Sequence, residues 1–362
     1  MKLNIVRMIF GVYICASTAL AAPIVYKLTD LGSLGGSSAS ANAINSSGQT
    51  VSTLTSVTDR MSVFSSGTNI TPYGTEGEGA AINNSGQVVG TVVSNGTPAA
   101  TLWTGGGYLT LAKNAYAMGI NDSGQVTGST GGHAFLYSNG TMQDLGVLQG
   151  GTWSAGYAIN SSGEVVGYAN TASGAFQAFA TNSAGRLTKL GTLGGANSYA
   201  MAVNDAGQVV GSAQIAAGYL HAFLFTGGSL NDLGTLGGSS SYAYGINSSG
   251  QVVGYSYTAD GSAHVFLYQD GVMYDVNALL TSSKWDLTAA YGINDSGQIV
   301  GTAMLNGVEH AVRLDPVQIE LHSNTLGALD APFTAIPEPG TWVAAIACAG
   351  LLLYRSAKSR IK

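Results

Sequence analysis

The chain reads Tyr244-Gly245-Ile246-Asn247-Ser248-Ser249-Gly250-Gln251-Val252-Val253-Gly254-Tyr255, two short apolar runs on either side of a polar turn. Gly250 stands where such a turn favours a positive φ, so the two runs are expected to pair as antiparallel strands. Residues 264–268 and 272–276 add a third and a fourth apolar run. Four strands in about forty residues is the size of one propeller blade.

The same phrase occurs seven times, and we number the repeats 1 to 7 by their asparagines. Successive asparagines are 38 to 47 residues apart. A unit that recurs at such a period predicts a repeat architecture. The seven residues are Asn45, Asn83, Asn121, Asn160, Asn204, Asn247 and Asn294.

The array of repeats starts and stops in the middle of a unit. Residues 26–32 match a fourth strand such as residues 142–146, whereas the last repeat loses the pattern after residue 314. A linear β-solenoid would leave both partial units open, but a ring lets the N-terminal strand complete the seventh. We therefore predict an all-β fold over residues 22–314, a seven-bladed β-propeller of four-stranded repeats closed by the N-terminal strand.

Four of the five histidines occupy one repeat position, and each is matched by an aspartate. In three repeats the aspartate follows 11 residues later, and in the last repeat ring closure would supply Asp30. Repeats without the histidine also lack the aspartate, which predicts a structural hydrogen bond within each blade. A metal site is not predicted, because blades spread the histidines around a ring. The pairs are His133 with Asp144, His221 with Asp232, His264 with Asp275, and His310 with Asp30.

No catalytic residue, metal ligand or cofactor is predicted. The carboxylates outside the repeat pattern cannot be placed at the separation that glycoside hydrolysis requires. Aromatic side chains near the first strands, among them Tyr116, Tyr157, Tyr199 and Tyr291, are expected to pack between blades rather than stack on a sugar. Any enzymatic site would be expected in the longest insertion, residues 277–289, which includes Lys284, Trp285 and Asp286.

Charge is scarce and unevenly placed. Charged residues are 9% of the chain, and residues 22–336 hold seven basic and 18 acidic ones. Phosphate binding relies on clustered Lys and Arg, so nucleic acid is not an expected partner. Both cysteines, Cys15 and Cys348, lie in the end segments, so the body between them needs no disulfide.

The N-terminus is typical of a secretory signal peptide over residues 1–21. Lys2 and Arg7 precede an apolar run, and small residues at Ala19, Ala21 and Ala22 mark the cleavage site. A retained anchor is disfavoured because the apolar run is short of the ~20 residues that span a bilayer. We expect export and removal by signal peptidase.

The C-terminus has three parts in order over residues 337–362. Pro337, Glu338 and Pro339 come first, an uncharged segment to residue 354 follows, and a basic tail ends the chain. This predicts a transmembrane helix with its basic end in the cytoplasm. Residues 315–336, which lack the repeat pattern, are expected to be a linker.

Two resemblances follow from these motifs. The C-terminal segment resembles a PEP-CTERM sorting signal of Gram-negative bacteria, which implies recognition of Pro337, Glu338 and Pro339 by an exosortase-type enzyme, cleavage, and delivery to the outer surface or exopolysaccharide matrix. The phrases Ile-Asn-x-Ser-Gly-Gln-Val-Val-Gly, His-Ala-Phe-Leu and Asp-Leu-Gly-x-Leu-Gly-Gly resemble the HAF family of bacterial extracellular repeats over residues 26–314. That family implies secretion, without a defined activity.

Two functions remain open from the sequence. The first is a non-enzymatic surface or biofilm-matrix protein that binds polysaccharide or another cell-surface component through its loops. The second is a glycan-active hydrolase or lyase built on the same propeller. In the first case the partners are the two processing enzymes, an exopolysaccharide or surface glycan, and the membrane before cleavage.

Overall fold

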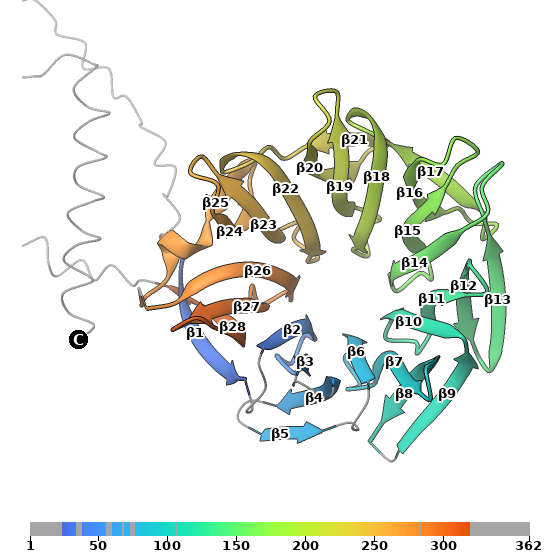
Figure 1. Cartoon of the computed structure of the whole chain (residues 1–362), viewed down its shortest axis with the longest axis horizontal. Coiled ribbons are helices and arrows are strands. Elements are labelled where there is room, and N and C mark those ends of the chain that lie inside the picture. Colours follow the sequence, from blue (N-terminus) through green and yellow to red (C-terminus); the bar gives the residue numbers. More distant parts are fainter. Residues whose placement is uncertain are drawn as a thin grey trace, which may run out of the picture. The chain divides into compact units, whose positions relative to one another are not determined.

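The described strands form a ring of small antiparallel sheets (Figure 1). The computed structural model describes residues 24–33, 38–55, 60–66, 69–72, 77–105, 107–282 and 284–318. Residues 25–317 make one compact unit. The structure is an all-β propeller, as the repeats predict.

Five sheets have four strands, paired in chain order. They are β6 (Gly77–Ile82), β7 (Val88–Ser94), β8 (Thr97–Thr104) and β9 (Gly107–Lys113); β10 (Ala115–Ile120), β11 (Val126–Thr130), β12 (His133–Ser138) and β13 (Thr141–Gly146); β14 (Ser154–Ile159), β15 (Val165–Asn170), β16 (Phe176–Thr181) and β17 (Leu187–Gly191); β18 (Gly194–Val203), β19 (Val209–Ile215), β20 (Leu220–Thr226) and β21 (Ser229–Asp232); and β22 (Gly237–Ile246), β23 (Val252–Thr258), β24 (Ala263–Gln269) and β25 (Val272–Asp275). The 3-10 turn η1 (Val276–Leu279) follows β25.

The sixth sheet has eight strands and closes the ring. It joins β26 (Asp286–Ile293), β27 (Ile299–Leu305), β28 (Val308–Gln318) and β1 (Ile24–Gly32) to β2 (Ser38–Ile44), β3 (Thr50–Thr55), β4 (Arg60–Ser66) and β5 (Asn69–Pro72). The N-terminal strand β1 pairs with β28, so the predicted closure is confirmed (Figure 1).

The predicted count of seven separate blades is not reproduced by the sheets. A single parallel pair, Ser38 with Glu309, connects β2 to β28 and merges the first and last repeats into one sheet. Counted by its sheets, the propeller therefore has six blades. The predicted boundary at residue 314 also falls short, because β28 continues to Gln318.

Each hairpin between first and second strands is held by its own asparagine. In repeat 6, the backbone N–H of Asn247 donates to Gln251 O and that of Gly250 donates to Asn247 O, both at 3.1 Å. Gly250 has a φ of 77°, which a residue with a Cβ adopts only with strain. The expected antiparallel pairing follows, with Ile246 opposite Val252.

The asparagine side chains also connect the repeats. Each Nδ2 donates to the backbone carbonyl of the asparagine in the next repeat at 2.9 to 3.2 Å, and Asn294 donates to Asn45 to complete a ring of seven bonds. The seven residues are only 3 to 6% exposed. Buried polar groups need such partners, so the ring fixes the distance between neighbouring inner strands.

The predicted end segments lie outside the described residues. These are the signal peptide at residues 1–21, the sorting signal at residues 337–362, and the linker beyond residue 318. Among the residues that are described, no helix has the length and apolar character needed to cross a membrane.

Replacing Asn294 with Ala tests the closure of the ring. The change removes the donor to Asn45 O and the acceptor for the backbone N–H groups of Ser296 and Gln298. We expect urea unfolding to show a loss of about 1–3 kcal/mol, the cost of leaving buried groups unpaired. The exposed Ser296→Ala is the control, and an equal effect of both changes would contradict a role for the ring.

Candidate functional site

A cavity of about 630 Å³ lies along the channel at the centre of the ring, and one repeat position lines it in all seven repeats. This position precedes the repeat asparagine by three residues. The seven lining residues are Asn42, Ala80, Met118, Tyr157, Met201, Tyr244 and Tyr291.

A β-bulge occurs at this position in every repeat. The register of first and second strands skips one residue each time, for example Tyr157 between Gly156 and Ala158. A bulge leaves its extra residue out of the ladder and can re-aim a side chain. The same β-bulge thus directs all seven side chains into the channel.

The lining differs around the ring. Tyrosines stand in repeats 4, 6 and 7, and methionines in repeats 3 and 5. Repeats 1 and 2 carry the smaller Asn42 and Ala80, with Ser40, Glu78 and Thr91 beside them. The cavity therefore has an aromatic wall and a smaller, polar wall.

Neighbouring rings support the aromatic wall. Tyr157 stacks on Tyr168 at 5.0 Å between centroids, and their hydroxyl oxygens are 2.9 Å apart. Tyr244 packs edge-on against Tyr291 at 5.6 Å and stacks on Tyr255 at 6.0 Å. Aromatic packing of this kind adds about 0.5–1.5 kcal/mol per pair beyond the area buried.

The three tyrosines of this wall stay protonated at neutral pH. Burial raises the pKa of Tyr157, Tyr244 and Tyr291, and the nearby carboxylate of Glu309 adds to the rise for Tyr291. An ordinary tyrosine already titrates near pH ~10. The hydroxyls of Tyr244 and Tyr291 can therefore donate hydrogen bonds to a ligand, whereas that of Tyr157 already contacts Tyr168 and can accept one.

The polar wall is ordered by hydrogen bonds. Asn42 Nδ2 donates to Thr53 Oγ1 and to Gly79 O, each at 2.8 Å, and Asn42 Oδ1 accepts from Ser40 Oγ. Glu78 is exposed and lines the same cavity. No Lys or Arg is among the described lining residues.

The aromatic residues were predicted only in part. The expected packing between blades is confirmed for Tyr199, which packs edge-on against Tyr168 of the preceding repeat, and for Tyr291, which packs against Tyr244. Tyr116, Tyr157 and Tyr291 also line the cavity, which the sequence does not predict, and Tyr116 is 46% exposed. Tyr244 is predicted only as the start of a first strand and not as a lining residue. Its signal in the sequence was the contrast between a varied position and the unvaried asparagine three residues later.

All four predicted His–Asp pairs are in contact. Nδ1 of each histidine lies 2.8 to 3.0 Å from a carboxylate oxygen of its aspartate. Because an ionised carboxylate only accepts, Nδ1–H is the donor. The histidine side chains are 16 to 38% exposed, so the pairs lie at the surface rather than in the core.

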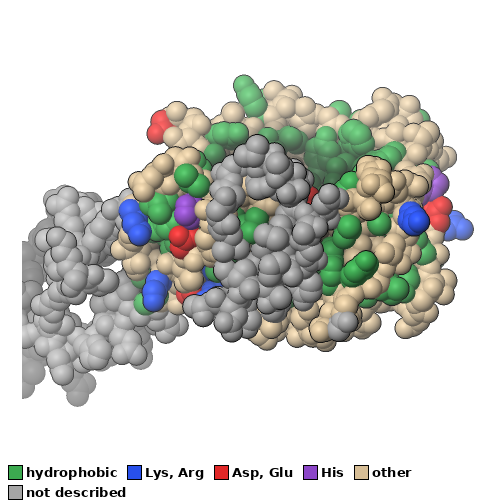
Figure 2. Space-filling model, turned by 60° about the horizontal axis from the view of Figure 1, so that its bottom comes forward, with side chains coloured by type: hydrophobic (Ala, Val, Ile, Leu, Met, Phe, Trp, Pro, Cys, Tyr) green, Lys and Arg blue, Asp and Glu red, His purple; other side chains and the backbone are tan. Residues whose placement is uncertain are grey.

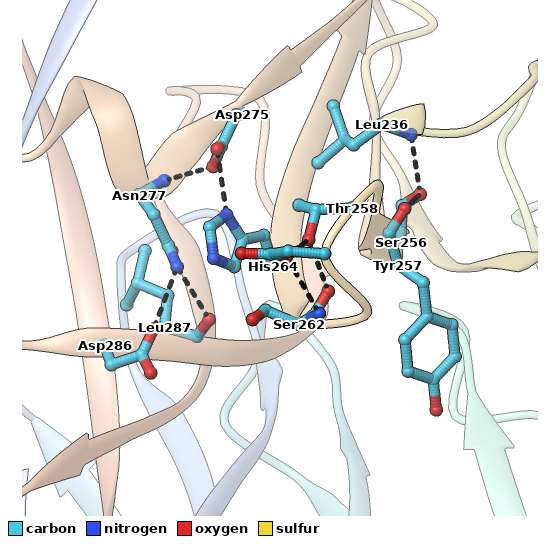
Figure 3. Close-up of polar contacts among 11 residues, drawn as sticks. Leu236, Ser256, Tyr257, Thr258, Ser262, His264, Asp275, Asn277, Asp286 and Leu287 are labelled. Atoms are coloured by element: carbon cyan, nitrogen blue, oxygen red, sulfur yellow. Dashed lines mark hydrogen bonds and ion pairs between the residues drawn. The ribbon is translucent and has the colours of Figure 1, made fainter. Parts of the chain in front are cut away.

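The His264 pair extends into a chain of contacts between repeats 6 and 7 (Figure 3). Asp275 accepts from His264 Nδ1 at 2.8 Å and from the backbone N–H of Asn277 at 2.9 Å. Asn277 Nδ2 donates in turn to Asp286 Oδ1 and Leu287 O, both at 3.1 Å. This histidine thus helps to anchor η1 and β26.

The three residues singled out in the insertion at residues 277–289 make packing and hydrogen-bond contacts in the described part of the chain. Trp285 is 8% exposed and packs edge-on against His310 at 5.3 Å, with Lys284 Nζ 5.5 Å from its ring centre. Asp286 is held by Asn277. None of these three residues lines the channel cavity.

The remaining predictions concern metal ligands, surface charge and the two end motifs. Within the described part of the chain, no group of three His, Cys, Asp or Glu residues could hold a metal ion. Figure 2 shows a face with few charged side chains, in keeping with the composition. Ala19, Ala21 and Ala22 and the motif Pro337, Glu338 and Pro339 lie outside the described residues.

Comparison with known proteins identifies a shared fold. No protein-family model and no curated protein matches the chain. A puromycin hydrolase is similar over 78% of this chain and 52% of its own, with a TM-score of 0.53 and 12% identity.

Two further solved structures have lower TM-scores. TolB from Acinetobacter baumannii covers 82% of this chain and 63% of its own (TM-score 0.41, 11% identity), and a gluconolactonase from Xanthomonas campestris covers 80% and 89% (0.42, 10%). This chain spans about half the length of the puromycin hydrolase. Likeness at such identities concerns the fold alone.

Acid should remove the contribution of the His133–Asp144 pair. Partial burial disfavours the charged carboxylate, but hydrogen bonds from His133 and the Gly146 backbone N–H outweigh it and lower the pKa of Asp144. The pair therefore adds stability above the unfolded pKa, near ~3.9, and loses it as pH falls through the lowered folded pKa.

We expect Asp144→Asn to lower the melting temperature at about pH 7 and to show a smaller deficit at about pH 2.5, where more of the carboxylate is protonated. Asp270→Asn is the control for charge, since Asp270 occupies an exposed turn with a positive φ that Asn also adopts in this chain. A deficit of the same size at both pH values would rule out the pairing as its cause.

Proposed function

We propose that the protein is an exported, non-enzymatic propeller that binds polysaccharide, or another cell-surface glycan, in its channel cavity. The observation that carries this proposal is the set of seven bulge residues, which point varied side chains into one cavity while the asparagine ring stays uniform. A cavity of this volume is typical of small-ligand sites.

The chemistry of the lining supports a sugar ligand. A pyranose has apolar C–H faces that pack on aromatic rings and hydroxyls at its edge that need hydrogen-bond partners. Tyr157, Tyr244 and Tyr291 supply ring surface and hydroxyls, and Asn42 and Ser40 supply polar groups on the other wall.

The same lining favours binding over hydrolysis. Glycoside hydrolysis ordinarily uses two carboxyl groups on either side of the bond. Glu78 is the one acidic residue among the described residues that line the cavity. A glycan-active enzyme would thus need a second carboxyl group from elsewhere.

We also propose that the eight-stranded sheet acts as two blades, giving seven. The asparagine ring has seven members and the channel has seven bulges, while one parallel pair connects the halves of this sheet. The first and last repeats would then present their channel residues as the other repeats do.

Export and sorting complete the proposal. The signal peptide and the resemblance of residues 337–362 to a PEP-CTERM signal support passage across the inner membrane, a transient membrane anchor, and exosortase-type cleavage. The product would then reach the outer surface or the extracellular matrix of a Gram-negative bacterium. The cysteine-free body suits a place outside the cytoplasm, since it needs no reduced thiol.

Binding to the host's exopolysaccharide tests the function. We expect the secreted protein to co-sediment with the polysaccharide without releasing new reducing ends. Tyr157→Ala combined with Tyr244→Ala should weaken binding at least about tenfold, because two stacking contacts are lost. Tyr219→Ala, at an exposed position outside the cavity lining, is the control. New reducing ends would make the protein an enzyme instead.

Sorting is tested separately at the C-terminus. We expect Glu338→Gln to leave the protein full length in the membrane fraction, since the recognition motif would lose its charge. The parent protein should appear in the outer fraction, shortened at its C-terminus. Mass spectrometry of both fractions checks this, and normal release of the variant would contradict the role given to Glu338.

A further inference from the structure

Glu164 is the exception in a repeat position that otherwise holds glutamine. The residue lies four positions after the repeat asparagine, immediately before the second strand. The other six repeats carry Gln49, Gln87, Gln125, Gln208, Gln251 and Gln298.

The glutamines have two hydrogen-bonding roles. Their Oε1 accepts from the asparagine of the same repeat at 2.6 to 2.8 Å, in every repeat with a glutamine. In three repeats Nε2 also donates to a side chain in the second half of the third strand. These contacts are Gln125 to Ser138, Gln251 to Gln269 and Gln298 to Asp315.

Glu164 retains the first role and loses the second. Its Oε2 accepts from Asn160 Nδ2 at 3.0 Å, as the glutamines do. Its Oε1 has no donor among the residues that the structure describes, and a carboxylate cannot donate to the third strand as a glutamine does. One carboxylate oxygen is thus left for a ligand.

A cavity of about 840 Å³ adjoins this carboxylate, between repeats 3 and 4 and apart from the channel. Leu136, Leu145 and Val165 contribute apolar surface, and the turn at residues 181–185 forms another side. Gln143, Ser162 and Asn182 add polar groups, and the described lining includes no Lys or Arg. Burial, opposed in part by Asn160, raises the pKa of Glu164, as expected for a carboxylate without a cationic partner.

We propose that this cavity binds a primary ammonium group carried on an aliphatic chain, with Glu164 Oε1 as its acceptor and Leu136 and Leu145 in contact with the chain. An ammonium is a compact donor that needs one oxygen, whereas a guanidinium favours both oxygens of a carboxylate. Asn160 already uses one of the two lone pairs of Oε2, so a donor that needs only Oε1 fits with less competition than a bidentate guanidinium. Two sources share this chemistry, a lysine side chain of a protein and a small diamine.

Calorimetry on the full-length protein tests the site with three probes. They are Nα-acetyl-lysine methylamide, 1,5-diaminopentane, and the lysine probe acetylated at its side-chain nitrogen. We expect saturable binding of at least one amine and at least about tenfold weaker binding of the acetylated probe. Preference for the lysine probe would identify a protein source, and preference for the diamine a small-molecule source.

Two variants assign the binding to Glu164. Glu164→Gln restores the residue of the other repeats, keeps the acceptor for Asn160, and should weaken amine binding at least about tenfold with an unchanged fold by circular dichroism. Gln208→Glu places a carboxylate beside Asn204 in repeat 5, outside this cavity, and should leave the affinity unchanged. Equal amine binding by Glu164→Gln and the parent, or equal affinity for the acetylated probe, would overturn the proposal.

Discussion

The hydrogen bond from each asparagine side chain to the backbone of the next repeat is the constraint on which the rest of the propeller depends. It sets the spacing of the inner strands, and seven such bonds return the chain to its start. The same side chain accepts from the backbone of its own turn, so hairpin and ring are formed by one residue. A buried amide with all its groups paired leaves little freedom in this part of the strand.

The repeat asparagine lies three residues after the varied bulge residue of the first strand. One position keeps the repeats connected, and the other lines the cavity. The asparagine must be the same in every repeat because its partner is backbone. The bulge residue is released from the ladder, so its side chain can change without disturbing strand pairing. A ring of identical scaffolds can therefore carry an irregular cavity, with tyrosines on one side and small polar groups on the other.

Much of the fold could be predicted because its causes are periodic. The phrase around Asn247 gave the hairpin, and the 11-residue spacing between His133 and Asp144 gave a contact, including the long-range one between His310 and Asp30. The Ser38–Glu309 pair that merges two repeats occurs once, so no repeated pattern in the sequence predicts it. The sequence predicts the packing of Tyr291 between blades but not that Tyr157 and Tyr291 also face the cavity, because a bulge shifts the two-residue alternation that sequence reasoning assumes for a strand. Glu164 could have been noticed as a break in the repeat, but its cavity depends on side chains from another repeat.

The pairing of β1 with β28 has a consequence for the order of assembly. Asp30 and His310 are 280 residues apart in the chain, so the contact forms only when nearly the whole propeller exists. Until then β1 lacks its partner strand β28. The repeats that have already folded form an open arc, and the strand edge of β1 remains without a partner. A chain that emerges N-terminus first therefore remains an incomplete ring through most of its synthesis. The entropic cost of bringing two chain segments together grows only slowly with the number of residues between them. Closing the ring late therefore costs little more entropy than joining segments that are closer in the chain.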